Sequence, residues 1–215
     1  MTSLLIITGP TSGLGRALTT IAVEEHQRVL LIGRNIKEKL VDLIPTEQND
    51  FIEVDFSIPQ ECISIFESHD FSEFSEINLV LNAGTILPLE QITKLDFTDY
   101  TLGFNVNFLS QVALVKSLLS KLNLSKVKLG IINITTGATT RVIDGWSCYS
   151  SSKAAFEIFL RHLAVEVPAL KIQSFEPGVF ESKIQEQIRF SLGESASETN
   201  LPSPEQVAQI LFKRI

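Results

Sequence analysis

The sequence predicts an α/β fold in which helices cover both faces of a single parallel β-sheet. Short apolar runs that suit strands alternate along the chain with longer segments that suit helices. The apolar runs are continuous, which is typical of strands buried on both faces. A glycine-rich turn also stands between the first strand and the first helix, where folds of this class bind phosphate.

The first half of the chain supplies three strands and three helices. Its apolar runs, beginning with SLLIIT and RVLLIG, predict strands at 3–8, 28–33 and 51–54. The segments that follow them suit helices at 14–26, 36–44 and 60–68. Each strand is therefore followed by a helix, as parallel pairing requires.

The second half repeats the alternation. Apolar runs predict strands at 77–83, 128–135 and 169–175, and helices are expected at 96–122, 147–167 and 204–214. Each right-handed crossover lays a helix on one face of a parallel sheet. We therefore expect a doubly wound, Rossmann-type sheet of about six strands in the order 3-2-1-4-5-6.

The whole chain, 1–215, is expected to form one domain. Its 215 residues, of which 44% are hydrophobic, can bury one sizeable core. The stretch from Phe190 to Pro204 is rich in Ser, Glu and Pro and predicts a mobile loop. We expect a lid around 179–203 that closes over a bound ligand.

Composition argues against several kinds of partner and location. The net charge of −7 disfavours binding to nucleic acid or anionic lipid. Without an uninterrupted apolar run of about 18 residues, we expect no membrane span. The first eight residues lack the basic region of a signal peptide. Cys62 and Cys148 form no metal or disulfide pattern, so we expect no metal site and a cytoplasmic location.

The glycine-rich turn is the first candidate binding site. Its glycines allow a tight turn, close approach of the backbone to phosphate oxygens, and close packing of helix on strand. The helix N-terminus adds unpaired N–H groups and a partial positive charge. The predicted dinucleotide-binding residues of this turn are Gly9, Thr11, Ser12, Gly13, Leu14 and Gly15. An ordinary tight turn is the alternative for such a cluster in isolation.

The end of the second predicted strand bears on which dinucleotide binds. Enzymes that use the unphosphorylated nicotinamide cofactor usually place an acidic residue there. This chain has Arg34 instead. A guanidinium can bind a 2′-phosphate through a fork of hydrogen bonds, whereas a carboxylate would repel it. We therefore predict a preference for NADP(H), with NAD(H) possible; the alternative for Arg34 is a solvated loop charge.

The run Tyr149-Ser150-Ser151-Ser152-Lys153, together with the glycine turn, resembles the short-chain dehydrogenase/reductase family. The resemblance covers nearly the whole chain. Further matching positions, in the family's order, are Asp55, Asn82-Ala83-Gly84, Asn107, and Pro177-Gly178-Val179 with Ser182. The stretches from Thr135 to Ala138 and from Gly145 to Ala155 look most similar to the benzil reductase and sepiapterin reductase subgroup.

The resemblance implies a catalytic set of Tyr149, Lys153, Thr136 and Asn107, while the other matching positions would contact the cofactor. Thr136 stands where the family usually has serine; it keeps the hydroxyl but adds a methyl that crowds the carbonyl. Asn107 would hold a water that links Lys153 to solvent. A local helix irregularity is the other interpretation of an asparagine there.

The i, i+4 spacing of Tyr149 and Lys153 places both on one face of a helix. We expect the Lys153 ammonium, together with an oxidised nicotinamide, to lower the pKa of the phenol. Tyr149 would then donate its proton to a carbonyl oxygen as hydride arrives from the cofactor. Trp146 and Phe180 would supply apolar walls for the substrate, with ordinary core packing as the alternative for each.

The expected function is therefore NADPH-dependent reduction of a small-molecule ketone or α-dicarbonyl to an alcohol. Two alternatives stay open. One is an NAD-dependent alcohol dehydrogenase of the same family. The other is a sensor or scaffold that binds NADP(H) without catalysis, which the departure at Thr136 would favour.

The predicted helix at 96–122 carries apolar residues around much of its circumference, so burial on more than one side is expected. The resemblance implies a homodimer formed through this helix and the one at 147–167. Family members usually continue into a seventh strand at the sheet edge. This chain stops at Ile215, directly after its last predicted helix, so we expect that strand to be absent.

Overall fold

A computed structural model of the chain has the predicted sheet. It describes residues 2–25, 27–40, 43, 50–191 and 200–215. Neighbouring strands are all parallel, and their order is β3-β2-β1-β4-β5-β6, as predicted. The strands are β1 (Ser3–Thr8), β2 (Arg28–Gly33), β3 (Asp50–Glu53), β4 (Glu76–Leu81), β5 (Lys128–Ile134) and β6 (Lys171–Phe175).

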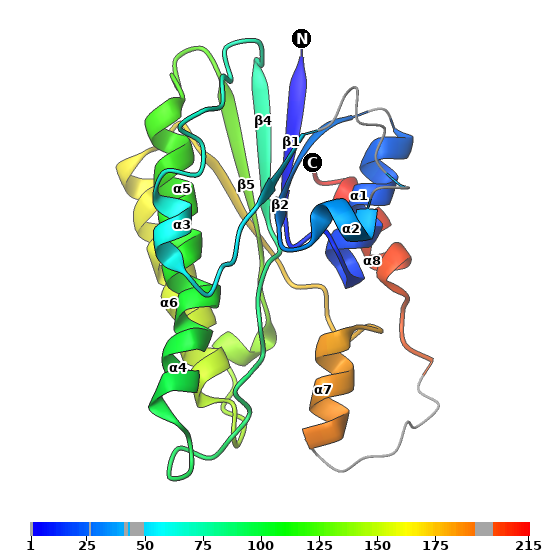
Figure 1. Ribbon diagram of the computed structural model, residues 1–215, viewed down its shortest axis with the longest axis vertical. Helices are drawn as coiled ribbons and strands as arrows, with labels where there is room; N and C mark the ends of the chain where they lie inside the picture. The colour runs from blue at the N-terminus through cyan, green and yellow to red at the C-terminus, as the bar shows by residue number, and fades with distance from the viewer. Residues whose placement is uncertain (1, 26, 41–42, 44–49, 192–199) are drawn as a thin grey trace.

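Helices cover both faces of this sheet, which confirms the doubly wound arrangement (Figure 1). One face carries α3 (Pro59–Ile63), α4 (Phe97–Phe104), α5 (Ser110–Lys121) and α6 (Ser147–Glu166). The other face carries α1 (Gly13–Glu24), α2 (Ile36–Leu40) and α8 (Pro204–Phe212). The helix α7 (Lys183–Ser191) follows β6 and lies below the sheet in this view.

The continuous apolar strands supply two cores, one on each face. Successive side chains of a strand point to opposite faces of the sheet. Leu4 and Ile6 of β1 therefore join the core under α5 and α6, whereas Leu5 and Ile7 join the core under α1 and α8. Full burial of each such side chain contributes roughly 1.5–3 kcal/mol relative to exposure. Burial on both faces explains why apolar and polar residues do not alternate along these strands.

The helix predicted at 96–122 forms as three consecutive pieces. It begins after Asp96, whose carboxylate accepts a hydrogen bond from the Thr98 N–H at 2.7 Å. A π-helical segment, η1 (Asn105–Leu109), joins α4 to α5. Such a segment inserts one extra residue into a helical turn. It is centred on Asn107, where a helix irregularity was one of the two predictions.

The run Phe97–Lys121 is long and apolar enough, by length and composition alone, to cross a membrane. Within its most apolar window, 44% is buried inside the fold, and Leu114 and Leu118 belong to the core between α5 and the sheet. This packing accounts for part of its apolar character. The expectation that the chain has no membrane span stays a prediction.

The helix predicted at 60–68 is too long, because α3 ends at Ile63. Beyond it, the Glu67 N–H donates to the Ser64 carbonyl, and the His69 N–H donates to the Phe66 carbonyl. These tight turns bury the Phe66 side chain completely. Burial of a phenylalanine against the sheet thus outweighs local helix propensity.

The loop predicted around 179–203 contains the helix α7, so that part of the prediction was wrong. The Ser182 hydroxyl accepts a hydrogen bond from the Gln185 N–H at 3.2 Å and caps the first turn. Residues 192–199 of the expected lid lie outside the described residues. The same holds for His26, 41–42 and 44, at the ends of two predicted helices.

Candidate active site

The glycine turn between β1 and α1 excludes side chains at its glycines, through positive φ angles at Gly9 and Gly13 and through crowding at Gly15. Gly9 and Gly13 have φ angles of 66° and 51°, which disfavour other residues. A Cβ atom on Gly15 would lie 2.1 Å from the Gly9 carbonyl oxygen. At Gly13, by contrast, no described atom lies within 4 Å of where a Cβ would be, so the backbone is open to a ligand. The turn therefore fits the phosphate site predicted for it.

The predicted residues of this turn lie around the start of α1. Ser12 is the N-cap residue and makes no side-chain capping bond to the helix. The first turn of α1 thus lacks this usual partner for its N–H groups, which suits anion binding. Thr11 is partly exposed beside it, while Leu14 is buried in the core under α1.

The predicted Asn82-Ala83-Gly84 group lies directly against the turn. The Thr8 hydroxyl accepts hydrogen bonds from the backbone N–H groups of Asn82 and Ala83, both at 2.9 Å. The Asn82 side-chain amide donates to the carbonyls of Thr8 and Gly9 at 3.0 and 3.1 Å. These bonds fix the carboxyl end of β1 to that of β4, where the sheet's winding direction reverses.

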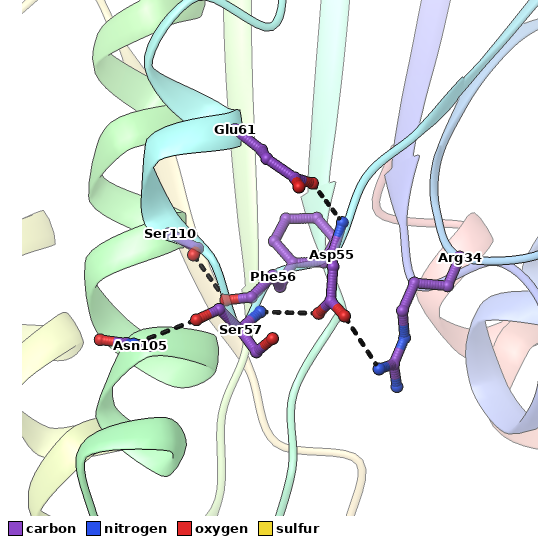
Figure 2. A network of polar contacts seen from close by, with 7 residues as sticks. All are labelled: Arg34, Asp55, Phe56, Ser57, Glu61, Asn105 and Ser110. Carbon is purple, nitrogen blue, oxygen red and sulfur yellow. Dashed lines mark hydrogen bonds and ion pairs between the residues drawn. The ribbon is translucent and has the colours of Figure 1, made fainter. Parts of the chain in front are cut away.

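Arg34 and Asp55, at the ends of β2 and β3, form an ion pair (Figure 2). The Arg34 Nη1 lies 3.4 Å from the Asp55 Oδ2, and the Arg34 side chain is 69% exposed. Burial raises the pKa of Asp55, but hydrogen bonds from Ser57 and the charge of Arg34 outweigh it, so the pKa lies below its ordinary value. The guanidinium thus keeps most of its hydrogen-bonding capacity facing solvent at the place predicted for a 2′-phosphate.

The loop that carries Asp55 is tied to the long helix, as Figure 2 also shows. The Ser110 hydroxyl donates to the Phe56 carbonyl at 2.6 Å, and the Asn105 side-chain amide donates to the Ser57 carbonyl at 3.0 Å. Both donors lie at the boundaries of the π segment. The same segment therefore holds this loop and presents Asn107 to the next part of the site.

Asn107 is almost fully buried and has three hydrogen bonds. Its Oδ1 accepts from the Thr85 N–H at 2.8 Å, while its Nδ2 donates to the Thr85 carbonyl at 2.8 Å and to the Ser152 hydroxyl at 3.0 Å. Ser152 lies between Tyr149 and Lys153 on α6, and its hydroxyl donates to the Tyr149 carbonyl. Asn107 thus joins the loop after β4, the long helix and α6. Its water-holding role stays a prediction.

Tyr149, Lys153 and Thr136 come together at the carboxyl end of β5. The Thr136 hydroxyl accepts a hydrogen bond from the Ala138 N–H at 3.3 Å and lies near enough to the Tyr149 phenol to lower its pKa. The neighbouring Thr135 Oγ1 is buried without a partner among the described residues. This places Thr136, as predicted, beside the phenol. Lys153 is only 8% exposed, and its Nζ donates to the Ile134 carbonyl.

The expected lowering of the Tyr149 pKa is not what these protein groups produce. Burial raises the pKa of Tyr149 above its ordinary value, although the hydrogen bond from Thr136 opposes this. Removing water from around a phenol disfavours its charged form, and here that effect is the larger one. The phenol therefore holds its proton firmly at neutral pH.

Of the two predicted apolar walls, only Trp146 lies next to Tyr149. Their ring centroids are 5.8 Å apart, with an edge-to-face angle of 72°. Phe180 instead packs against the core under α1 and α8, which was the alternative given for it.

The predicted cofactor segment after β6 has an exposed turn. Gly178 has a φ angle of 71°, and Val179 beside it is 59% exposed. Pro177 is partly buried, and Ser182 caps α7. Among the described residues, no three His, Cys, Asp or Glu side chains gather as a metal site would need.

Sequence reasoning missed three side chains that hold the site together: Thr8, Ser152 and Glu157. Thr8 and Ser152 stand inside the recognised motifs, but their partners lie far away in the sequence, so no local pattern reveals them. Glu157 offered a signal, because Tyr149, Lys153 and Glu157 are spaced by four residues and share one helix face.

Replacing Lys153 with methionine should change how the free energy of unfolding depends on pH. Burial lowers the pKa of Lys153 from 10.5 to about 8, and Glu157 partly opposes this. Between about pH 8 and 10.5, Lys153 is protonated in the unfolded chain but not in the folded protein. The free energy of unfolding therefore rises with pH over this range, by on the order of 3 kcal/mol in total. Urea unfolding between about pH 7 and 10 should show a much smaller rise in Lys153→Met. Identical pH dependences would contradict the assignment.

The chain resembles known oxidoreductases over most of its length. Residues 3–192 match the short chain dehydrogenase family. A benzil reductase ((S)-benzoin forming) of Bacillus cereus is 29% identical over 96% of this chain and 91% of its own length. One of Bacillus subtilis is 30% identical over 87% and 79%, respectively.

A solved structure agrees with the same assignment. The crystal structure of the KRED1-Pglu enzyme superposes with a TM-score of 0.84 and is 27% identical, covering 99% of this chain and 94% of that one. Since the family match spans nearly the whole sheet and the site at its carboxyl edge, the chain belongs to the short-chain dehydrogenases, a family of NAD(P)(H)-binding oxidoreductases.

Proposed function

We propose that the protein is an NADPH-dependent reductase that converts a ketone or α-dicarbonyl to an alcohol, with Tyr149 as the proton donor. The observation that carries this proposal is that Tyr149, Thr136 and the buried Lys153 gather at the carboxyl end of β5, where the Lys153 Nζ donates to the Ile134 carbonyl. The similarity to two benzil reductases supports a carbonyl, and specifically a diketone, as the substrate class.

The raised pKa of Tyr149 suits reduction. A proton donor must carry its proton at working pH, and burial keeps the phenol neutral there. The Thr136 hydroxyl can bind the same carbonyl oxygen that receives the proton, so both groups orient the substrate. Trp146 packs edge-to-face on the phenol ring and restricts its movement.

Lys153 and the glycine turn would hold the cofactor. Gly13 leaves the backbone accessible at the start of α1, where a diphosphate would accept N–H hydrogen bonds, while Gly9 and Gly15 allow the turn to pack closely. The bound nicotinamide supplies hydride to the carbonyl carbon. Because its pKa is about 8, Lys153 is largely protonated at neutral pH. It can therefore donate hydrogen bonds to the ribose hydroxyls and stabilise the phenolate that remains after Tyr149 has donated its proton.

Arg34 supports the preference for NADPH. Its guanidinium is exposed and has one long contact, to Asp55, so its remaining N–H groups can form a fork on a 2′-phosphate. Asp55 would limit how far the guanidinium moves. A carboxylate at the position of Arg34, which would favour NADH, is absent from the sequence there.

A homodimer is part of the proposal. Large apolar side chains are exposed on α4, η1 and α6: Phe97, Leu102, Leu109, Ile158 and Val165. Contiguous exposed apolar surface is costly in a monomer and typical of an interface. The physiological compartment is proposed to be the cytoplasm.

Substitution of Tyr149 by phenylalanine should remove the proton donor and lower kcat for diketone reduction by about 10²–10⁴-fold. NADPH binding, followed by cofactor fluorescence, should persist. Tyr100→Phe, at the only other tyrosine of the chain, is the matched control and should keep full activity. Wild-type protein that binds NADPH but reduces no ketone or diketone in a panel would instead favour a non-catalytic sensor.

Substitution of Arg34 by alanine should raise the KM for NADPH by roughly 10–100-fold, because a charge-assisted hydrogen-bond pair is lost. The KM for NADH should stay nearly unchanged. Arg161→Ala, on the exposed surface of α6, controls for the loss of one positive charge. Equal effects of Arg34→Ala on both cofactors would argue for an NAD-linked enzyme.

Light scattering at micromolar concentration should give a mass near twice 23.9 kDa. Phe97→Asp should shift the protein toward monomer, because Phe97 is 80% exposed on α4. Val142→Asp is the control, since Val142 is fully exposed on a loop outside α4 and α6. A wild-type monomer would refute the dimer.

A further inference from the structure

Glu157 lies one helical turn after Lys153 and faces the sheet from α6. Its Oε1 accepts a hydrogen bond from the Asn133 side-chain amide of β5 at 3.1 Å. The Ser174 hydroxyl of β6 lies 3.1 and 3.3 Å from its two carboxylate oxygens. Asn133 and Ser174 are directly opposite each other in the pairing of β5 with β6. One carboxylate therefore joins α6 to both strands.

The same strand also holds Lys153. Asn133 is followed by Ile134, whose carbonyl accepts the hydrogen bond from the Lys153 Nζ. Consecutive residues of β5 thus anchor consecutive turns of α6, the first through Glu157 and the second through Lys153. Because both residues lie on α6, a displacement of Glu157 from Asn133 would also displace the Lys153 Nζ from the Ile134 carbonyl.

Asn133 is oriented toward this carboxylate at a cost. It is only 1% exposed, and its Oδ1 has no hydrogen-bond partner among the described residues. An unpaired buried carbonyl oxygen is unfavourable by roughly 1–3 kcal/mol. Its amide nitrogen donates to the Glu157 carboxylate. A hydrogen bond to a charged acceptor is stronger than one to a neutral acceptor, which favours this orientation of the side chain.

Lys153 needs a negative charge nearby because it is almost completely buried. Its contact from β5 is neutral, since the Lys153 Nζ donates to the Ile134 carbonyl. The side chains that contact Glu157 from β5 and β6, Asn133 and Ser174, are also neutral. Tyr149, on its own helix, is neutral as well. Within the described part of the chain, Glu157 is the charge that raises the pKa of Lys153 against the larger effect of burial.

We propose that Glu157 is a positioning residue, which holds the Lys153 side chain in place from one helical turn away and supplies the charge that balances it. This inference rests on the proposed function, in which Lys153 works as a cation beside Tyr149. The contacts of Glu157 are with Asn133 and Ser174, so it is proposed to act on the reaction only through Lys153. Its effect reaches the reaction through the protonation and the position of Lys153.

The decisive variant is Glu157→Gln, which keeps the size of the side chain and removes its charge. In the pH profile of kcat/KM for diketone reduction, the decline at high pH should move to lower pH by about one unit. Activity at pH 6 should stay within about threefold of wild type, because Lys153 is still protonated there. Glu166→Gln, the same charge change at the exposed end of α6, should leave the profile unmoved.

Two further variants separate charge from packing. Glu157→Asp keeps the charge on a shorter side chain, and Ser174→Ala keeps the charge but loses one hydrogen bond. Both should melt at a lower temperature, yet both should retain the wild-type position of the high-pH decline. If the role of Glu157 were purely structural, Glu157→Gln would behave like these two variants. It would lower activity equally at all pH values, and the high-pH decline of its kcat/KM would not move.

The pH dependence of unfolding keeps this inference distinct from the proposed function, since it needs neither substrate nor cofactor. In Glu157→Gln, the rise of stability with pH should begin at lower pH than in wild type. If the wild type reduces no carbonyl and this shift occurs, the proposed function fails and the link between Glu157 and Lys153 stands. If the wild type turns over normally and neither pH dependence shifts, the inference is overturned and the function stands.

Discussion

The hydrogen bonds between Thr8 and Asn82 are the constraint on which the site depends. They fasten the carboxyl ends of β1 and β4 at the point where the winding of the sheet reverses. The helices that follow these strands leave on opposite faces, so a crevice opens between them. Because Asn82 also binds the Gly9 carbonyl, the same bonds set the shape of the glycine turn. The binding half of the site is therefore a consequence of strand order.

The reactive half is built on a second constraint, the burial of polar groups under α6 and the long helix. Asn107 and Lys153 are both less than a tenth exposed, and each is satisfied by backbone or side-chain partners from another element. Buried polar groups are stable only when paired, so these contacts tie the π segment, β5 and α6 into one rigid unit. Tyr149 is positioned by that unit rather than by its own contacts alone.

Much of this was visible in the sequence. Continuous apolar runs, alternating with helical segments, predicted the parallel sheet and the order of its strands. Strands that are buried on both faces need apolar residues at successive positions, and a single sequence shows such runs directly. The spacing of Tyr149 and Lys153 predicted their shared helix face, and Thr136 was placed correctly beside the phenol. The weak helix propensity of asparagine pointed to the irregularity at Asn107.

What the sequence could not predict depends on tertiary contacts. The turn that buries Phe66, the helix α7 and the packing of Phe180 follow from how neighbouring elements meet, which local patterns do not record. The direction of the Tyr149 pKa was also missed, because the spacing of charges was visible but the extent of burial was not. The role of Glu157 depends on the register of β5 and β6, which only the fold reveals.

Tyr149 is held in its protonated form beside Thr136, ready to act as an acid, and its titration tests this most directly. The chain has only two tyrosines, so a ¹³C NMR titration of labelled tyrosine gives two phenol signals, and Tyr100→Phe assigns them. In the protein alone, the pKa of Tyr149 should lie above the ordinary value of 10.0 and should rise further when Thr136 is replaced by valine. A pKa of Tyr149 below 10.0, or one indifferent to Thr136, would contradict it.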